Sequence, residues 1–275
     1  HGSYLFQYPS GEDVFQIIPK ASNTAYTEFG CPSPSAVEYL KQFIPENELF
    51  PPKPGTAWET HHAFNAWASV ETWLCLNTIE YYFGVCDSLE QIVTYGQLLQ
   101  SEGYKCIYEE ARRQKPKCSM ALNWCYNEPW PTAANNSIIN WPAIPKPAYY
   151  AVKASCRPLL ASARIPKFKW YEGEVFNPEL WILNDLPNTV PAGTLKAYIQ
   201  YDNEKISLIQ WDYPQIMENQ NLKGQSLIFQ LKFPKSGFIK LMLNIDDHPE
   251  MDTEYTLLYE IKKGKKRDAP AHNIK

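Results

Sequence analysis

The sequence predicts a chain of two parts, a mainly helical α/β part followed by an all-β sandwich. Two observations predict this division. Apolar residues recur at helical spacing in the first half, and they alternate with a period of two after about residue 160. The length of 275 residues and the apolar content of 44% suffice for two ordinary domains or one large domain. We place the boundary between Pro158 and Pro166, which gives domains over residues 1–162 and 163–275.

The first part carries several helical patterns and few strands. Residues 34–43 predict a short helix, and residues 58–84 predict one or two buried helices. Asp87 and Glu90 fit a capping box, in which each side chain bonds an unpaired N–H group of the first turn. The long helix that follows ends before Pro116. Two further elements complete the part: a short buried strand over residues 119–126 and a helix over residues 146–155.

The second part reads as a series of about seven strands. Four apolar series each share one face of a strand, namely Leu195, Ala197 and Ile199; Leu227, Phe229, Leu231 and Phe233; Ile239, Leu241, Leu243 and Ile245; and Tyr255, Leu257, Tyr259 and Ile261. Shorter strands are predicted over residues 167–171, 179–184 and 206–211. This pattern is typical of an antiparallel, immunoglobulin-like sandwich of about 100 residues.

Composition excludes several classes of function. The net charge of −4 argues against nucleic acid as a partner, since binding to phosphates favours a basic surface. The basic run over residues 262–267 reads as a solvated tail. No apolar run reaches the length that spans a membrane. The seven cysteines form no CxxC pair, which fits neither a zinc site nor a disulfide framework, although one or two disulfides stay open.

Two smaller motifs are of interest. Adjacent histidines on a helix point in different directions, so His61 and His62 predict a structural or pocket-rim role rather than a shared metal. The triplet that begins at Asn135 is a glycosylation sequon. The opening residues His1–Ser3 read as the remnant of an expression tag.

Three segments, in order, resemble glycoside hydrolase family 2, in particular its β-mannosidase and exo-β-glucosaminidase branch. Thr27-Glu28-Phe29-Gly30 is similar to the Ser/Thr-Glu-Phe/Tyr-Gly signature at the end of barrel strand seven. The segment over residues 122–131 resembles the strand-eight pattern Trp-x-Leu-Asn-Asp-x-Trp-Pro, and residues 146–153 resemble the helix that follows. Residues 179–185 are similar to a strand of the family's C-terminal sandwich.

This resemblance implies a fold and an activity. The fold is the C-terminal part of a (β/α)8 barrel followed by an immunoglobulin-like sandwich. Since a closed barrel needs about 250 residues, the first part is expected to be a portion of a longer enzyme. The implied activity is that of a retaining exo-β-glycosidase that needs no cofactor. Its substrate is a glycoside or oligosaccharide with a terminal β-linked mannose or glucosamine, ahead of galactose or glucuronate.

Glu28 is the predicted nucleophile. It follows a short apolar strand and precedes Gly30, and the carboxyl end of a barrel strand faces the active site. A carboxylate held there can attack an anomeric carbon and form a glycosyl-enzyme. The alternative is an ordinary exposed glutamate at the end of a strand.

Glu128 is not the acid/base, although Asn127-Glu128-Pro129 looks like the motif that carries it in related barrels. That motif belongs to strand four, upstream of the nucleophile, whereas Glu128 lies downstream of Glu28. The resemblance therefore implies that Glu128 and Asn127 line the substrate pocket. Trp124 is implied as a platform for a sugar ring, with core packing as its alternative, and Tyr4 is implied as a strand-six aromatic near the nucleophile.

No residue of this chain supplies the general acid/base, which is expected upstream. A retaining pair needs its second carboxyl about 5–5.5 Å from the first. Two other interpretations stay open: a non-catalytic carbohydrate-binding or structural fragment, and a self-contained α+β protein of unrelated function. The expected partners are the sugar substrate and the remaining upstream domains of the same polypeptide. The compartment is open, with an exported or lysosomal location favoured over a cytoplasmic one.

Overall fold

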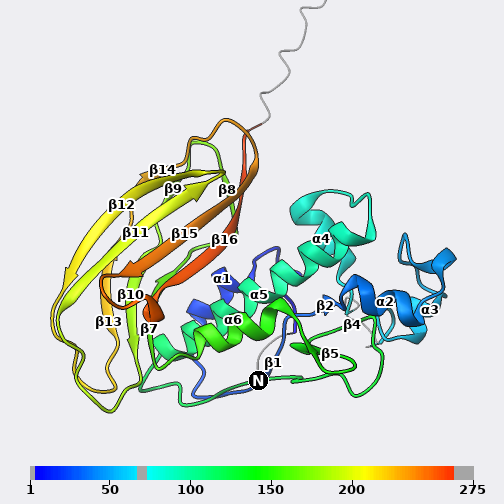
Figure 1. Cartoon of the computed structure of the whole chain (residues 1–275), viewed down its shortest axis with the longest axis horizontal. Helices are drawn as coiled ribbons and strands as arrows, with labels where there is room; N and C mark the ends of the chain where they lie inside the picture. Colours follow the sequence, from blue (N-terminus) through cyan, green and yellow to red (C-terminus); the bar gives the residue numbers. More distant parts are fainter. Residues whose placement is uncertain (1–3, 67–72, 263–275) are drawn as a thin grey trace, which may run out of the picture.

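The structure is a computed structural model that describes residues 4–66 and 73–262 (Figure 1). His1–Ser3 and the basic run from Lys263 onward lie outside these residues, as does part of the predicted helical segment over residues 58–84. Along the described part of the chain, no helix is long and apolar enough to span a membrane.

The first part consists of helices packed around a few short strands. Its helices are α1 (Val14–Ile17), η1 (Ile18–Lys20), α2 (Val37–Phe43), η2 (Glu46–Glu48), α3 (Ala57–Thr60), α4 (Leu76–Phe83), α5 (Leu89–Arg113) and α6 (Pro147–Ser155). Its strands are β1 (Tyr26–Phe29), β2 (Ser33–Pro34), β3 (Ala121–Asn123), β4 (Ala134–Asn135), β5 (Ile139–Asn140) and β6 (Ile144–Pro145). The helices predicted at α2, α5 and α6 are therefore present.

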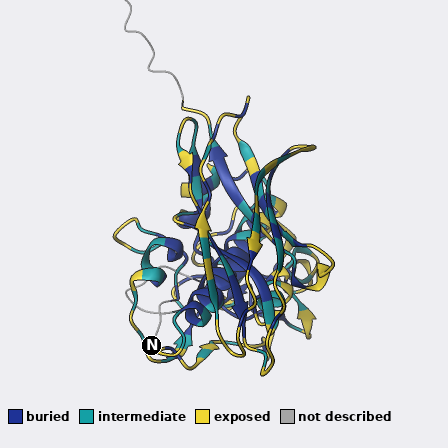
Figure 2. Cartoon of the chain, turned by 90° about the vertical axis from the view of Figure 1, so that its left-hand side faces the viewer, coloured by how far each residue is buried: buried dark blue, intermediate teal, exposed yellow. Residues whose placement is uncertain are grey.

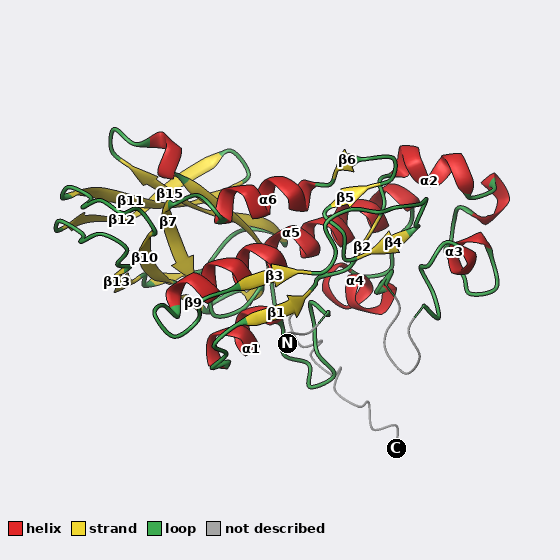
Figure 3. Cartoon of the chain, turned by 90° about the horizontal axis from the view of Figure 1, so that it is seen from below, coloured by secondary structure: helices red, strands yellow, loops and turns green. Residues whose placement is uncertain are grey.

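One βαβ unit organises this part. β1 and β3 are parallel neighbours, and the long helix α5 connects them (Figure 3). Parallel strands require a crossover of this kind. β3 differs from its prediction, since it spans three residues and is not buried, with Leu122 51% exposed. The strand is therefore apolar but not buried, because no described segment covers the face that carries Leu122.

The cap of α5 lies one residue later than predicted. Ser88, not Asp87, is the N-cap, and its hydroxyl accepts a hydrogen bond from the N–H of Gln91 at 3.2 Å. The side chain of Gln91, not Glu90, accepts a hydrogen bond from the N–H of Asp87 at 2.8 Å. Serine is as good an N-cap as aspartate, so the choice between the two adjacent residues depends on how the preceding turn packs.

The second part is a sandwich of two main sheets. Its strands are β7 (Leu159–Arg164), β8 (Lys169–Tyr171), β9 (Val175–Phe176), β10 (Glu179–Asn184), β11 (Gly193–Tyr201), β12 (Glu204–Tyr213), β13 (Leu222–Ser226), β14 (Phe229–Gln230), β15 (Gly237–Ile245) and β16 (Thr253–Glu260), with the short helix η3 (Pro249–Met251) before β16. One sheet has the order β12-β11-β15-β16-β8 and the other has the order β13-β10-β7. The pair β9-β14 forms a small third sheet.

The predicted alternation is confirmed in β11 and β15, whose inward residues are fully buried while their neighbours are more exposed. Of the strand predicted over residues 227–233, only Phe229–Gln230 forms a strand, the short β14, while β13 ends before this range at Ser226. Ile261, placed on the inner face, is 38% exposed because it lies beyond the end of β16. β7 was not predicted as a strand, yet it pairs antiparallel with β10 along its whole length.

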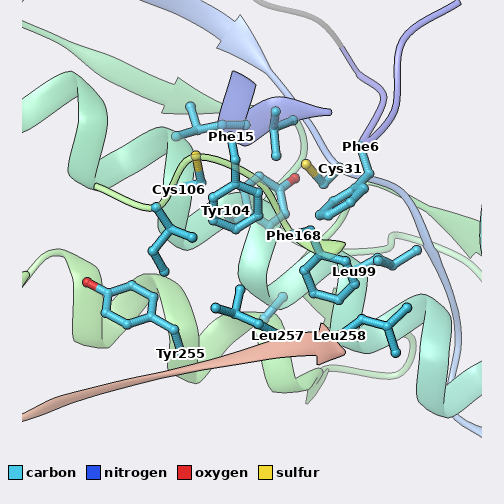
Figure 4. Packing of buried hydrophobic residues seen from close by; sticks show 14 of the residues in the cluster. Phe6, Phe15, Cys31, Leu99, Tyr104, Cys106, Phe168, Tyr255, Leu257 and Leu258 are labelled. Carbon is cyan, nitrogen blue, oxygen red and sulfur yellow. The ribbon is translucent and has the colours of Figure 1, made fainter. Parts of the chain in front are cut away.

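A single apolar core joins the two parts. Phe6 and Phe15 of the first part pack against Phe168, which precedes β8, with ring centroids 5.4 and 6.4 Å apart. Leu99 and Leu257 lie in the same cluster (Figure 4). Figure 2 shows the buried residues gathered between the sheets and toward the helices. The sandwich is therefore packed onto the helical part rather than tethered to it.

Asp13 is a buried carboxylate at this junction. It is 3% exposed, and its Oδ2 accepts hydrogen bonds from the Phe168 N–H at 3.1 Å and the Tyr82 hydroxyl at 3.4 Å. Its Oδ1 has no hydrogen-bond partner among the described residues. Burial raises the pKa of Asp13 to about 6, although the N–H groups of Phe168 and Gln16 oppose the shift.

We predict that Asp13→Asn changes the pH dependence of stability. Because the folded pKa is above the unfolded value of 3.8, the stabilising contribution of Asp13 is full below that value and is lost as the pH rises through about 6. The asparagine of the variant does not ionise, so its contribution to stability is the same at every pH. Relative to the wild type, it should therefore gain up to about 3 kcal/mol between pH 3.5 and pH 7.5. Urea unfolding of both proteins at the two pH values measures this gain.

Asp246→Asn provides the control, since this carboxylate is exposed and pairs with Lys196 at the surface. Its effect should stay within about 1 kcal/mol at both pH values. A stability difference between Asp13→Asn and the wild type that does not change with pH would contradict the assignment of Asp13 as a buried, perturbed acid.

Candidate functional site

Glu28 lies near the carboxyl end of β1. Its neighbour Phe29 is buried, whereas Glu28 itself is partly exposed. Phe29 is aligned with Asn123 of β3, and its carbonyl accepts a hydrogen bond from the N–H of Trp124 at 2.8 Å. The carboxylate of Glu28 forms no hydrogen bond with another described residue. It is therefore a half-exposed acid at the same edge of the parallel pair as Trp124.

An aromatic cluster stands at this edge. The ring of Trp124 lies 5.7 Å from that of Tyr4 and 5.9 Å from that of Trp73, and Tyr4 and Trp73 are 6.2 Å apart. Trp124 remains 39% exposed, so it keeps free ring surface. The structure thus brings together Tyr4 and Trp124, which were singled out from the sequence, and adds Trp73. Trp73 was read only as part of a buried helical segment, and no local pattern distinguishes it.

Glu128 is buried behind the same strand end. It is 3% exposed, its Oε2 accepts a weak hydrogen bond from Asn135 at 3.4 Å, and its Oε1 has no hydrogen-bond partner among the described residues. Burial and the negative charges of Glu128 and Glu28 raise the pKa of Cys125 to about 11. The thiol of Cys125 therefore lies within the electrostatic reach of both carboxylates.

A buried cation accompanies Glu128. Lys146 is fully buried, and its Nζ lies 3.4 Å from the carbonyl oxygens of Ser33 and Asn135. Burial lowers the pKa of Lys146 to about 8, and Glu128 opposes the shift. The sequence predicted only a helix at this position. Nothing in its pattern marks the helix N-cap Lys146 as a buried charge.

Asn127 and the two histidines border this region. Asn127 is exposed, and its side chain forms no hydrogen bond with another described residue. The Nδ1–H of His61 donates a hydrogen bond to the carbonyl of Pro131 at 2.7 Å, and its ring stacks on Trp130 at 5.7 Å. His62 contacts Trp130 edge-on, and burial lowers its pKa while Glu128 opposes the shift. Among the described residues, no group of acids, histidines and cysteines is arranged to hold a metal ion.

Gly30 allows the segment after β1 to approach its neighbour. A Cβ at this position would lie 2.5 Å from the Cγ of Asn136, so any other residue would displace one of the two segments. Gln100 of α5 holds the same segments, because its Nε2 donates to the carbonyls of Cys31 at 2.8 Å and Asn136 at 3.2 Å. A glycine and a buried amide thus position the loop that follows Glu28.

The sequon and the cysteines gain a structural interpretation. Asn135 is 7% exposed and donates to Glu128, so its side chain is not accessible to a glycan in this fold. None of the seven cysteines, all of which are among the described residues, forms a disulfide.

Known proteins resemble this chain over all or part of its length. No family model matches it. Beta-mannosidase B of Aspergillus oryzae is 23% identical over 258 residues, which cover 90% of this chain and 28% of that protein. Beta-mannosidase B of Emericella nidulans is 32% identical over 106 residues, or 36% of this chain and 12% of that protein.

Solved structures share the fold. A beta-D-mannosidase from Dictyoglomus thermophilum superimposes with a TM-score of 0.68 and 19% identity, over 94% of this chain and 30% of that one. An exo-chitosanase from Amycolatopsis orientalis gives 0.66 and 15% identity, over 85% of this chain and 27% of that one. These matches confirm the resemblance drawn from the motifs and a fold of mixed α/β content with sheets. The chain spans less than a third of the length of each of these four proteins.

Proposed function

We propose that this chain, which belongs to glycoside hydrolase family 2, supplies the nucleophile half of a retaining exo-β-glycosidase. The observation that carries the proposal is the joint position of Glu28 and Trp124. Both lie at the carboxyl edge of two adjacent parallel strands, with the ring of Tyr4 beside that of Trp124. A carboxylate beside partly exposed aromatic rings is what a sugar-cleaving site requires: a nucleophile and a surface on which a pyranose ring stacks.

The first part is proposed to be the C-terminal portion of a (β/α)8 barrel and the second an immunoglobulin-like sandwich. The predicted boundary between residues 162 and 163 falls inside β7, which pairs with β10, so the sandwich is proposed to begin at Leu159. The unit β1-α5-β3 supports the first assignment, since parallel strands joined by helices are the repeat of that barrel. Among the described residues, β1 and β3 pair only with each other, so each has an open edge. Met120, just before β3, and Leu122, within it, are both exposed. Upstream strands of a longer polypeptide would cover these edges.

The proposed reaction has two steps. A carboxylate oxygen of Glu28 forms a bond to the anomeric carbon while the glycosidic bond breaks, and an acid on the upstream part protonates the departing oxygen. Water then attacks the anomeric carbon of the glycosyl-enzyme and gives its proton to the same acid/base residue, which frees Glu28. The chain carries the first carboxylate, and the second is proposed to lie outside it.

The remaining residues are proposed to hold the sugar. Trp124 offers a ring face for stacking, and Tyr4 supports it from the edge. The exposed Asn127 offers an amide, whereas the buried Glu128 is proposed to be a pocket-wall or structural carboxylate. The names of the relatives, β-mannosidases and an exo-chitosanase, favour a terminal β-linked mannose or glucosamine as the bound unit.

An assay of two proteins tests this division. We expect no turnover of aryl β-mannoside or aryl β-glucosaminide by the isolated chain, and turnover of one of them by the longer polypeptide that contains it. The physical reason is that one carboxylate cannot both attack and protonate the leaving group.

The alternative is a non-catalytic, carbohydrate-binding or structural fragment. Turnover by the isolated chain would contradict the missing acid/base. An inactive longer polypeptide that still binds the glycoside would favour the alternative. As a control for folding, the isolated chain should show near-ultraviolet circular dichroism from its packed aromatic side chains and lose it in one cooperative thermal transition.

A further inference from the structure

Two short segments meet behind the candidate site. β2 follows Glu28 along the chain and β4 follows Glu128, and the two strands pair antiparallel with Ser33 opposite Asn135. Each strand has only two residues, and a strand pair that short is not stable by itself. β2 also lies against α5 (Figure 3). Side chains from the neighbouring helices must therefore hold the two segments together.

Lys146 spans this strand pair. It is the N-cap of α6 and is fully buried. Its ammonium donates to the carbonyl oxygens of Ser33 and Asn135 and to the hydroxyl of Ser33, each at 3.4 Å. An ammonium has three N–H groups, so one side chain supplies a donor to both strands. Lys146 thus joins the segment that follows the proposed nucleophile to the segment that follows Trp124.

Gln100 of α5 reaches the same strand pair. The Ser33 hydroxyl donates to its Oε1 at 2.7 Å, and its Nε2 donates to the carbonyl of Ser137 at 3.3 Å. The Ser33 hydroxyl therefore donates to one helical side chain and accepts from the other. Gln100 is uncharged, whereas Lys146 brings a charge into the interior of the protein.

Stability alone does not explain the charge of Lys146. Burial lowers its pKa to about 8 and Glu128 opposes the shift, so the ammonium is mostly protonated at neutral pH. Its hydrogen-bond partners are neutral oxygens. Taking a charge out of water is costly, and buried charges are weak contributors to stability. An apolar side chain of similar length would avoid this cost, but it could not bond both strands.

The segment that leads from the proposed nucleophile to Ser33 is stiff. Pro32 and Pro34 have fixed φ angles, and the residue before each proline is restricted to extended backbone. Gly30, which precedes this segment, is closely packed against Asn136, so it has no room to absorb a movement. A displacement of Ser33 is therefore transmitted toward the end of β1.

We propose that Lys146 is a positioning residue for Glu28, an inference that rests on the proposed function. Its ammonium fixes Ser33 and Asn135 relative to each other, and the stiff segment before Ser33 sets the carboxylate at its distance from the anomeric carbon. Because Lys146 is fully buried, it contacts no substrate. Its effect on the reaction passes through Glu28 alone.

The test begins with the kinetics of variants of the longer polypeptide. Lys146→Met leaves Glu128 as a buried charge and can cost the fold, so it is made in a Glu128→Gln protein and compared with Glu128→Gln alone. We expect kcat for the hydrolysed aryl glycoside to fall by about tenfold or more, the scale of a small displacement of a reacting group. KM should change by less than about twofold, because the ring of Trp124 packs against other aromatic rings. Lys153→Met, an exposed residue of the same helix, is the matched control and should leave kcat unchanged.

Azide separates the placement of Glu28 from damage to the rest of the site. In a Glu28→Ala protein, added azide attacks the anomeric carbon in place of the carboxylate, and the glycosidic bond breaks with its electron pair on the departing aryl oxide. A residue that acts only by placing Glu28 has no effect in that setting. We therefore expect Lys146→Met, made in the Glu28→Ala, Glu128→Gln protein, to change the rate of glycosyl azide formation by less than about twofold.

A loss of kcat with Glu28 present, together with an unchanged azide rate, supports the proposal. A smaller loss of kcat than expected, or equal losses in the two settings, overturns it. A variant that does not fold loses both rates equally and also counts against the proposal. Failure of the proposed function would appear differently: Glu28→Ala would form no glycosyl azide even with Lys146 in place, and the role of Lys146 would fall with it.

Discussion

Replacing Glu28 by glutamine should abolish hydrolysis by the longer polypeptide. We expect kcat for an aryl β-mannoside or β-glucosaminide to fall by about 10⁴-fold or more, the scale found when a catalytic nucleophile is removed. Glutamine has the shape of glutamate but cannot form the covalent intermediate. Since Glu28 forms no hydrogen bond with another described residue, the substitution should leave stability nearly unchanged. Steady-state kinetics and a thermal unfolding curve measure both expectations.

Chemical rescue distinguishes a nucleophile from a residue that only shapes the site. Glu28→Ala opens space beside the anomeric carbon, so added azide should form the new bond in place of the carboxylate as the aryl oxide leaves. The product would be a glycosyl azide of inverted configuration, which nuclear magnetic resonance identifies. A residue with a purely structural role would give no such product.

Glu204→Gln is the matched control. Glu204 is an exposed glutamate at the start of β12 in the sandwich. Its replacement should change kcat by less than about twofold, as surface changes remote from a site usually do. Turnover at the wild-type rate by Glu28→Gln, or an equal loss in Glu204→Gln, would refute the assignment of the nucleophile.

Local patterns sufficed to place Glu28 at the end of a strand, whereas its role as the nucleophile stays a prediction. Glu28 was marked by a short apolar strand before it and by Gly30 after it, and the structure gives both a physical reason. The strand pairs with β3, and the glycine lets the following segment lie against Asn136. The alternation in β11 and β15 was likewise predictable, because a strand with one buried face imposes a period of two.

Contacts between distant segments could not be predicted from the sequence. Trp73 touches Tyr4 and Trp124 only because three separate segments converge. Lys146 stands in a sequence that reads as an ordinary helix start, yet tertiary packing buries its charge beside Ser33 and Asn135. The residue types of a segment do not show which distant segment packs against it.

Some errors arose because neighbouring residues offered equal choices. Asp87 and Ser88 are both good caps, and only the structure selects Ser88. Apolar composition also misled at β3, where Leu122 was expected to be buried and is exposed. An apolar composition indicates that a segment is suited to burial. It does not indicate whether the segment that would pack over it belongs to the same part of the chain.

The junction between the two parts contains a buried network of charges, centred on Arg113 at the end of α5. Arg113 is 7% exposed, and it pairs with Glu109 at 3.3 Å and with Glu110 at 3.1 Å. It also donates to the hydroxyl of Ser162 in β7, and the Tyr255 hydroxyl of β16 donates to Glu109 at 2.6 Å. The network therefore connects α5 with both sheets of the sandwich.

Electrostatics keep the Arg113 guanidinium charged in this setting. Burial alone lowers its pKa, but the adjacent carboxylates of Glu110 and Glu109 outweigh burial and raise it. Burial and Glu109 likewise raise the pKa of Tyr255 well above its usual range, so the phenol remains a hydrogen-bond donor. Each partner thus depends on the charge of the others.

Arg113→Met should destabilise the chain by about 3–5 kcal/mol, because it leaves the buried carboxylate of Glu109 without its cation. Glu110 keeps its ion pair with Arg164 at 2.7 Å. Urea unfolding at pH 7 measures the loss. Lys240→Met is the matched control, since Lys240 pairs with Glu254 at 2.9 Å on the surface and both side chains are largely exposed. Its removal should cost less than about 1 kcal/mol.

A double-mutant cycle shows whether the loss comes from charge or from packing. If Arg113→Met harms the fold by stranding a carboxylate, then adding Glu109→Gln should restore part of the stability, with a coupling of about 1–3 kcal/mol between the two sites. Additive losses would point to lost packing of the arginine stem instead. Equal destabilisation by Arg113→Met and Lys240→Met would show that the network does not hold the sandwich to α5. The position of the helix that joins β1 to β3 would then depend on the shared apolar core alone.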